Sequence, residues 1–157
     1  MRSIQLIRQY DRIVNLIKDT KQFCGDNLEF QGHWGKYICV ISAGFLENAI
    51  AEVYAEYISN SSSPIVSGFV QRTLEKVQNP KTSKFIEIAR SFKNEWGEDM
   101  ESFVQQNPDV KFSIDSIMQN RHLIAHGKTT SVSVVKIKDQ LEHAIKIVDF
   151  IEAQCGY

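Results

Sequence analysis

The three prolines of the chain stand at positions 64, 80 and 108, and their placement limits the fold more than any other feature of the sequence. Proline ends or kinks a helix, because it has no backbone N–H and its ring clashes with the preceding turn. The segments before Pro64 and after Pro108 contain no proline, so each can form long uninterrupted helices. The sequence therefore favours long helices towards both ends of the chain and shorter ones between them.

Apolar side chains recur at helical spacing along most of the chain. The predicted helices cover residues 3–23, 34–58, 65–78, 84–105, 113–126 and 134–153. We expect a bend near Trp96 and Gly97, and residues 130–135 alternate in a way that suits a short extended segment. The helix over 34–58 is apolar on most sides, which is typical of the middle of a bundle. The prediction is an all-α fold, a single domain over residues 1–157 with five or six helices.

Composition limits the function classes. The chain has 18 basic and 19 acidic side chains and a formal net charge of -1, so any nucleic-acid contact must be local rather than a basic coat. The three cysteines are widely spaced and form no metal-binding pattern. No stretch approaches the roughly 18 uncharged apolar residues that a membrane span needs. We expect a cytoplasmic protein that needs no metal, cofactor or membrane.

One segment, residues 117–127, concentrates the reactive side chains. On a helix its polar face carries Asp115, Gln119, His122 and His126. The apolar face carries Ile114, Ile117, Arg121 and Ile124. A guanidinium on an apolar face needs an anionic partner, because burying it alone is costly. We therefore expect Arg121 to lie close to Glu47, which sits among small residues on the central helix.

His126 falls in the last predicted turn, where the negative end of the helix dipole stabilises a cation and suits an imidazole to proton exchange. The surrounding sequence is locally basic, with five basic residues against Asp115 alone between positions 111 and 138. The basic residues are Lys111, Arg121, Lys128, Lys136 and Lys138. This is the local patch that a nearly neutral protein would need in order to meet a phosphate.

The arginine and histidine of this segment are separated by four residues. Asn120 precedes the arginine, a polar residue follows it, and Gly127 ends the helix before one more amphipathic helix. Together these features resemble the HEPN superfamily, and the chain looks closest to the RiboL-PSP-HEPN subgroup. The Phe-Leu-Glu-Asn-Ala-Ile stretch around Glu47 is similar to the helix that carries the acidic residue of that superfamily.

The resemblance implies a HEPN-like bundle acting as a metal-independent endoribonuclease, with a composite active site in a homodimer. Arg121 would stabilise the transition state, His126 would act as base or acid, and His122 or Asn120 would position the substrate. Lys128 and Lys111 are the expected RNA contacts. The products would be a 2′,3′-cyclic phosphate and a 5′-hydroxyl. A toxin or phage-defence role with an antitoxin or defence-system partner would fit such an enzyme.

Two other interpretations use the same residues. In a non-catalytic module that binds a partner protein or a nucleotide, Arg121 and Glu47 would simply form a structural pair. The spacing of His122 and His126 also suits metal binding, but the sequence offers no third ligand or general-base glutamate. Cleavage of RNA in the presence of EDTA separates the enzyme from the module.

Overall fold

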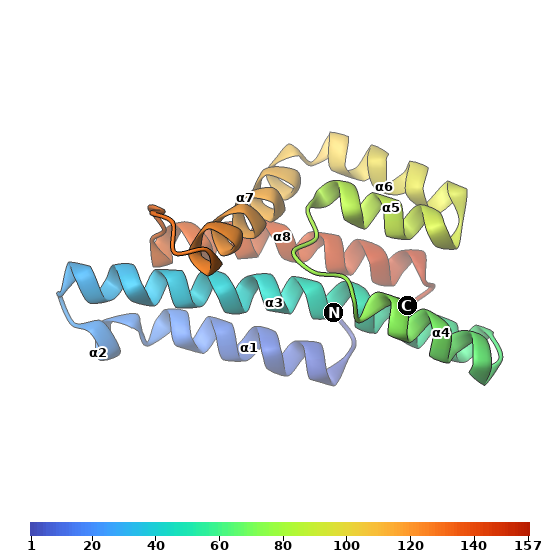
Figure 1. The fold of residues 1–157 in the computed structure, drawn as a ribbon, viewed down its shortest axis with the longest axis horizontal. Coiled ribbons are helices and arrows are strands. Elements are labelled where there is room, and N and C mark those ends of the chain that lie inside the picture. The colour runs from blue at the N-terminus through green and yellow to red at the C-terminus, as the bar shows by residue number, and fades with distance from the viewer.

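Helix α3 (Leu28–Ser61) is the axis of the structure, a computed structural model that describes residues 1–157. It runs the length of the molecule, α1 and α8 lie along it, and α7 packs against it at an oblique angle (Figure 1). The Asn27 side chain accepts a hydrogen bond from the backbone N–H of Phe30 and so caps its first turn. The helix begins six residues before the predicted start, because this cap precedes the apolar pattern.

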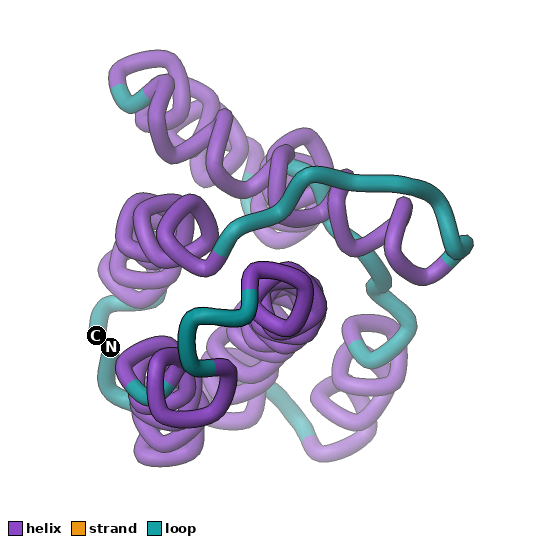
Figure 2. The backbone as a smooth tube through the Cα atoms, turned by 90° about the vertical axis from the view of Figure 1, so that its left-hand side faces the viewer, coloured by secondary structure: helices purple, strands orange, loops and turns teal.

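The chain forms eight helices, not the five or six predicted, and no strand (Figure 2). They are α1 (Ile4–Lys18), α2 (Thr20–Cys24), α3, α4 (Pro64–Leu74), α5 (Thr82–Phe92), α6 (Asn94–Gln106), α7 (Pro108–Ala125) and α8 (Val134–Gln154). Residues 130–135 are not a strand, since α8 already begins at Val134. The fold class is confirmed as all-α, while the helix count was wrong because two predicted helices are each divided in two.

Local backbone breaks divide those two helices. Asp19 separates α1 from α2, and the hydroxyl of Thr20 donates to the carbonyl of Ile17 at 2.7 Å. Lys93, with φ -151° and ψ 138°, is extended and separates α5 from α6. The predicted bend near Gly97 therefore lies four residues earlier. Neither break carries a proline or glycine, so the sequence gives little sign of them.

Gly97 has a different role from the predicted bend. It lies on the face of α6 that packs on α5. These two helices lie side by side at the upper right of Figure 1. An ideal Cβ at Gly97 would lie 2.6 Å from the Cβ of Arg90 and 3.1 Å from its Cα, both far inside van der Waals contact. A glycine is therefore required here so that the two helices can pack this closely.

One hydrophobic core of 30 buried residues joins every helix except α2. By length and composition α3 would also pass as a membrane-spanning helix, but 56% of its most apolar window is buried inside the bundle. Helices lie on several sides of α3 when the molecule is viewed along the bundle (Figure 2). Burial of this kind is the environment of a core helix.

Candidate active site at the end of helix α7

The last turn of α7 presents two histidines to solvent. Gly127 adopts φ +64°, and the backbone N–H groups of Gly127 and Lys128 donate to the carbonyls of Ile124 and Leu123 at 3.1 and 2.9 Å. This is the Schellman arrangement, which satisfies the final carbonyls and stops the helix directly after His126. His122 and His126 are both exposed, and their ring centroids lie 4.4 Å apart.

Arg121 lies between this exposed end and the core. Ile114 and Ile117, which precede it on the same face, are fully buried, whereas Arg121 is half-buried. Its guanidinium makes no hydrogen bond and no ion pair with any residue of the chain. A half-buried cation without a protein partner is costly unless it meets an external anion. The apolar face predicted for this helix is confirmed, including the arginine that interrupts it.

The expected ion pair between Arg121 and Glu47 is not formed. The Glu47 carboxylate accepts a hydrogen bond from the backbone N–H of Asn79, in the loop between α4 and α5. That N–H has no partner in a helix, so the carboxylate satisfies a backbone donor instead of the guanidinium. The prediction failed because it compared two helices and omitted the loop between α4 and α5, which supplies the partner of Glu47.

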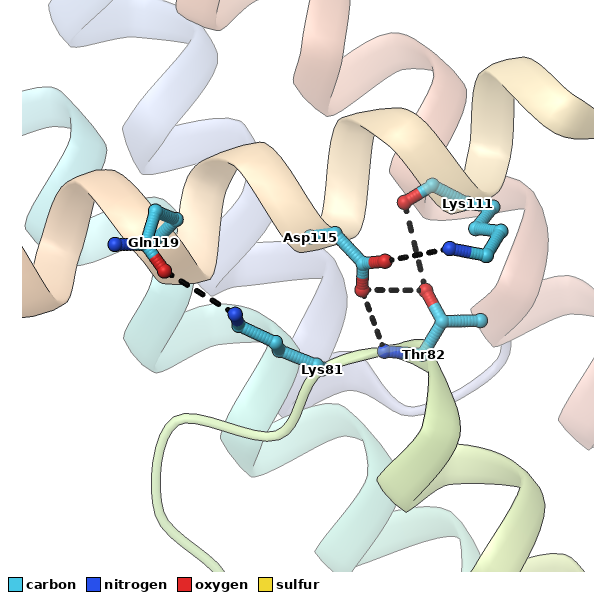
Figure 3. Close-up of polar contacts among 5 residues, drawn as sticks. All are labelled: Lys81, Thr82, Lys111, Asp115 and Gln119. Carbon is cyan, nitrogen blue, oxygen red and sulfur yellow. Dashed lines mark hydrogen bonds and ion pairs between the residues drawn. The ribbon is translucent and has the colours of Figure 1, made fainter.

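Residues 79–82 form a short polar strap from α3 to the middle of α7. Asp115 accepts hydrogen bonds from the backbone N–H and hydroxyl of Thr82 at 2.8 and 2.9 Å, and the ammonium of Lys81 donates to Gln119 at 3.1 Å (Figure 3). The side chains of Asp115 and Gln119 are therefore used in hydrogen bonds that hold the fold together. Of the four residues on the predicted polar face, only His122 and His126 have side chains without a hydrogen-bond partner.

Lys111 of α7 contacts the same carboxylate as the strap does. Its ammonium pairs with Asp115 at 3.0 Å, one turn further along α7 (Figure 3). Lys111 and Arg121 are ten positions apart, which corresponds to about 15 Å along a helix axis at 1.5 Å per residue. The structure thus places Lys111 with the strap and not beside Arg121 and His126, so only Lys128 of the two expected RNA contacts lies next to the histidines.

Asp115 is the ionised anchor of the strap. Burial of its carboxyl favours the neutral form, but the Thr82 N–H, the Lys111 ammonium and the Thr82 hydroxyl outweigh that effect and hold the pKa of Asp115 below its ordinary value of 3.8. A lowered folded-state pKa means that the carboxylate stabilises the fold above the ordinary pKa. This stabilisation is lost as the pH falls through the lowered value.

Asp115→Asn is therefore expected to lower the free energy of unfolding by about 1 kcal/mol at neutral pH. The difference from wild type should shrink as the pH falls below about 4, where the unfolded carboxyl takes up its proton. Urea unfolding of both proteins across this pH range measures the effect. Glu87→Gln, which breaks the exposed pair with Lys84, is the control and should change stability little. A difference that stays constant with pH would contradict the assignment.

The side chain of Asn120 holds the loop between α7 and α8 against α7 by a hydrogen bond. Its side-chain oxygen accepts from the hydroxyl of Thr130 at 2.6 Å, and its amide donates to Ser116 at 3.4 Å. The hydroxyl of Ser116 also accepts from the buried Gln140 of α8 at 2.7 Å. This network ties α7, the loop and α8 together next to Arg121. The sequence analysis did not predict that Thr130, Ser116 and Gln140 take part in this network. Only Ser116 could have been found from the sequence, because it lies four residues before Asn120 on the same helix face.

A family model for RiboL-PSP-HEPN proteins matches residues 4–157, which is nearly the whole chain. The chain belongs to the RiboL-PSP-HEPN family. No curated protein and no solved structure matches it. Membership of this HEPN-type family indicates a nuclease-like or RNA-related function, and it agrees with the resemblance that the arginine and histidine of α7 carry.

The electrostatics at this end of the RiboL-PSP-HEPN chain are locally positive. Lys128 and Lys136 are exposed and form no ion pair, and the half-buried Arg121 forms none either. Lys138 faces Glu142 at 3.8 Å, a long and exposed contact that neutralises it only weakly. Of the five basic residues predicted to form the patch, Lys111 is neutralised by Asp115, and Arg121, Lys128 and Lys136 remain without an ion pair.

The nucleophilic and metal-binding side chains of the chain do not gather at this site. Cys39 of α3 is buried under α7, where its thiol donates to the carbonyl of Ile117 at 3.6 Å. Burial raises the pKa of Cys39 to about 12, so this thiol stays protonated and is not a nucleophile. No group of three or more histidine, cysteine, aspartate or glutamate side chains is arranged to hold a metal ion.

Proposed function

We propose that this protein is a metal-independent endoribonuclease whose reactive groups are Arg121 and His126. The observation that carries the proposal is the half-buried guanidinium of Arg121, which has no partner in the chain and lies within two helical turns of two exposed imidazoles. A phosphodiester supplies the anion that Arg121 lacks. The exposed imidazole of His126 supplies proton transfer in the cleavage of the diester.

The chemistry follows the usual course of 2′-hydroxyl attack. An imidazole removes the 2′-hydroxyl proton, the oxygen attacks phosphorus, and the bond from phosphorus to the 5′-oxygen breaks as that oxygen takes up a proton from an acid. Arg121 stabilises the negative charge that develops on the phosphorane oxygens. We assign His126 as base or acid, and His122 as a positioning group. The products are a 2′,3′-cyclic phosphate and a 5′-hydroxyl.

A second copy of the chain is part of the proposed site. Arg121 and His126 are five positions apart, about 140° around a helix, so one copy aims them in different directions. Twofold pairing brings the groups of both copies to one cleft. The surface on which the second copy would complete the site is the exposed end of α7, where His122 and His126 meet solvent and Lys128 forms no ion pair.

The setting of the enzyme is part of the same proposal. A free ribonuclease damages its own cell, so we expect a toxin or phage-defence role in the cytoplasm, with an antitoxin or defence-system partner that restrains it. In the non-catalytic alternative Arg121 and Glu47 would form a structural pair, and that ion pair is not formed. The uncommitted Arg121 therefore favours the enzyme.

The test is cleavage of end-labelled single-stranded RNA by the purified protein in EDTA. We expect fragments to accumulate at the same rate with EDTA as with added Mg²⁺, because Arg121 and the imidazoles supply both charge stabilisation and proton transfer. A preparation of His126→Ala, purified identically, controls for contaminating ribonucleases. Cleavage that stops in EDTA and returns with Mg²⁺ would refute the metal-independent mechanism.

A further inference from the structure

A cavity whose lining includes neither of the exposed histidines lies at the other side of the loop before α8. It has a volume of about 900 Å³ and lies between α1, the first turns of α3 and the start of α8. Its apolar walls come from Val14 and Ile17 of α1, Val132 in the loop before α8, and Leu141 of α8. A volume of this order matches the sites that bind small organic molecules, which are also mainly apolar.

Two glycines of α3 explain why the cavity is open. At Gly35 the backbone of residues 132–134 crosses the helix so closely that an added Cβ would lie 3.0 Å from the carbonyl oxygen of Val132. At Gly32, one turn earlier, an added Cβ would meet nothing within 4 Å, and this residue lines the cavity. The loop before α8 therefore covers α3 at Gly35 and leaves its preceding turn uncovered.

The charged groups of the cavity stand at its rim and balance one another. Its three amines are Lys18, Lys21 and Lys138, and its three carboxylates are Asp11, Asp26 and Glu142. All six are exposed. Because the rim carries no net charge, it attracts neither an anion nor a cation as a class, and the apolar walls favour an apolar ligand.

Apolar surface remains exposed at the mouth of the cavity. Leu28 and Val135 line it and are 82% and 79% exposed, among the most exposed large hydrophobic residues of the chain. A bound apolar molecule would remove part of this surface from water, which stabilises the complex by roughly 25 cal/mol for each Å² covered. The walls and the mouth therefore both favour the same class of ligand.

We propose that this cavity is a binding site for an uncharged, mainly apolar small molecule. The cavity is linked through the chain to the end of α7. Val132 in its wall lies two residues beyond Thr130, whose hydroxyl donates a hydrogen bond to Asn120, the residue before Arg121. The binding claim stands on the cavity alone. It does not depend on whether the protein cleaves RNA.

The probe for the experiment is N-phenyl-1-naphthylamine, an uncharged apolar dye that fluoresces more strongly out of water. We expect saturable binding of one dye per chain to the wild type. Gly32→Trp and Val14→Trp, which fill the cavity from two different walls, should weaken binding at least about tenfold, since the dye loses its apolar enclosure. Gly68→Trp on α4, outside the cavity, is the matched control and should bind as the wild type does.

Circular dichroism and urea unfolding test whether the three variants are folded. Because two variants fill the cavity, the test remains possible if one of them does not fold. Bound dye should also slow amide exchange in residues 132–135 of the wild type, which locates it at the proposed wall. Binding that is absent, or equal in all three variants, would overturn the proposal. Tighter binding of the anionic dye 8-anilinonaphthalene-1-sulfonate would overturn the assignment to an uncharged ligand.

Discussion

Replacing Arg121 or His126 with alanine is expected to lower the rate of RNA cleavage by about 10²- to 10⁴-fold. Arg121 supplies transition-state charge stabilisation, and His126 supplies proton transfer. Neither side chain makes a hydrogen bond or ion pair in the protein, so both variants should unfold at nearly the wild-type urea concentration. Initial rates of cleavage of one labelled RNA, at equal concentrations of folded protein, measure the loss.

Two further variants make that result specific. His122→Ala should lose less activity, because His122 positions the substrate without exchanging its proton in the proposed mechanism. Arg72→Ala removes an exposed arginine of α4, well away from α7 in Figure 1, and should cleave as the wild type does. Equal activity in Arg121→Ala, His126→Ala and the wild type would exclude this site as the catalytic centre.

The largest expected effect on stability comes from Gly97→Ala. The added methyl would overlap the Cβ and Cα of Arg90, and the backbone of Arg90 cannot move without separating α5 from α6. We expect the free energy of unfolding to fall by about 2 kcal/mol, in the range measured for overpacked cores. Urea denaturation followed by circular dichroism measures this change.

Gly44→Ala is the matched control for this prediction. Gly44 is also a glycine inside a helix, but an added Cβ would meet nothing within 4 Å. Alanine has the higher helix propensity, so this variant should gain up to about 1 kcal/mol as a monomer. A Gly97→Ala protein that gains stability as Gly44→Ala does would show that α5 and α6 are not packed this closely.

The apolar periodicity predicted where the helices lie better than where they stop. The segments 34–58 and 134–153 are helical over their whole predicted length, because an apolar repeat on a proline-free segment leaves few alternatives. The breaks at Asp19 and Lys93 were missed, since both residues are compatible with a helix and only packing decides against it. Tertiary packing also explains Gly97, whose neighbour Arg90 lies on another helix.

The site was predictable to the extent that it lies on one helix. The spacing of Arg121, His122 and His126 fixed their faces, and the structure places them accordingly. The strap and the bond between Thr130 and Asn120 could not be predicted, because they join loops to helices through single polar contacts. Those contacts decide which polar residues are free. They remove Asp115, Gln119 and Glu47 from the reactive set and leave Arg121 without a partner.

The most direct test of the proposed mechanism is the mass of the fragments from an RNA with one reactive ribose. Every nucleotide of this substrate carries a 2′-O-methyl group except one at a position that the wild type cleaves. We predict a single cut after that nucleotide, with a 2′,3′-cyclic phosphate on one fragment and a 5′-hydroxyl on the other. Cleavage at a methylated position, or fragments that carry a 5′-phosphate, would contradict attack by the 2′-hydroxyl.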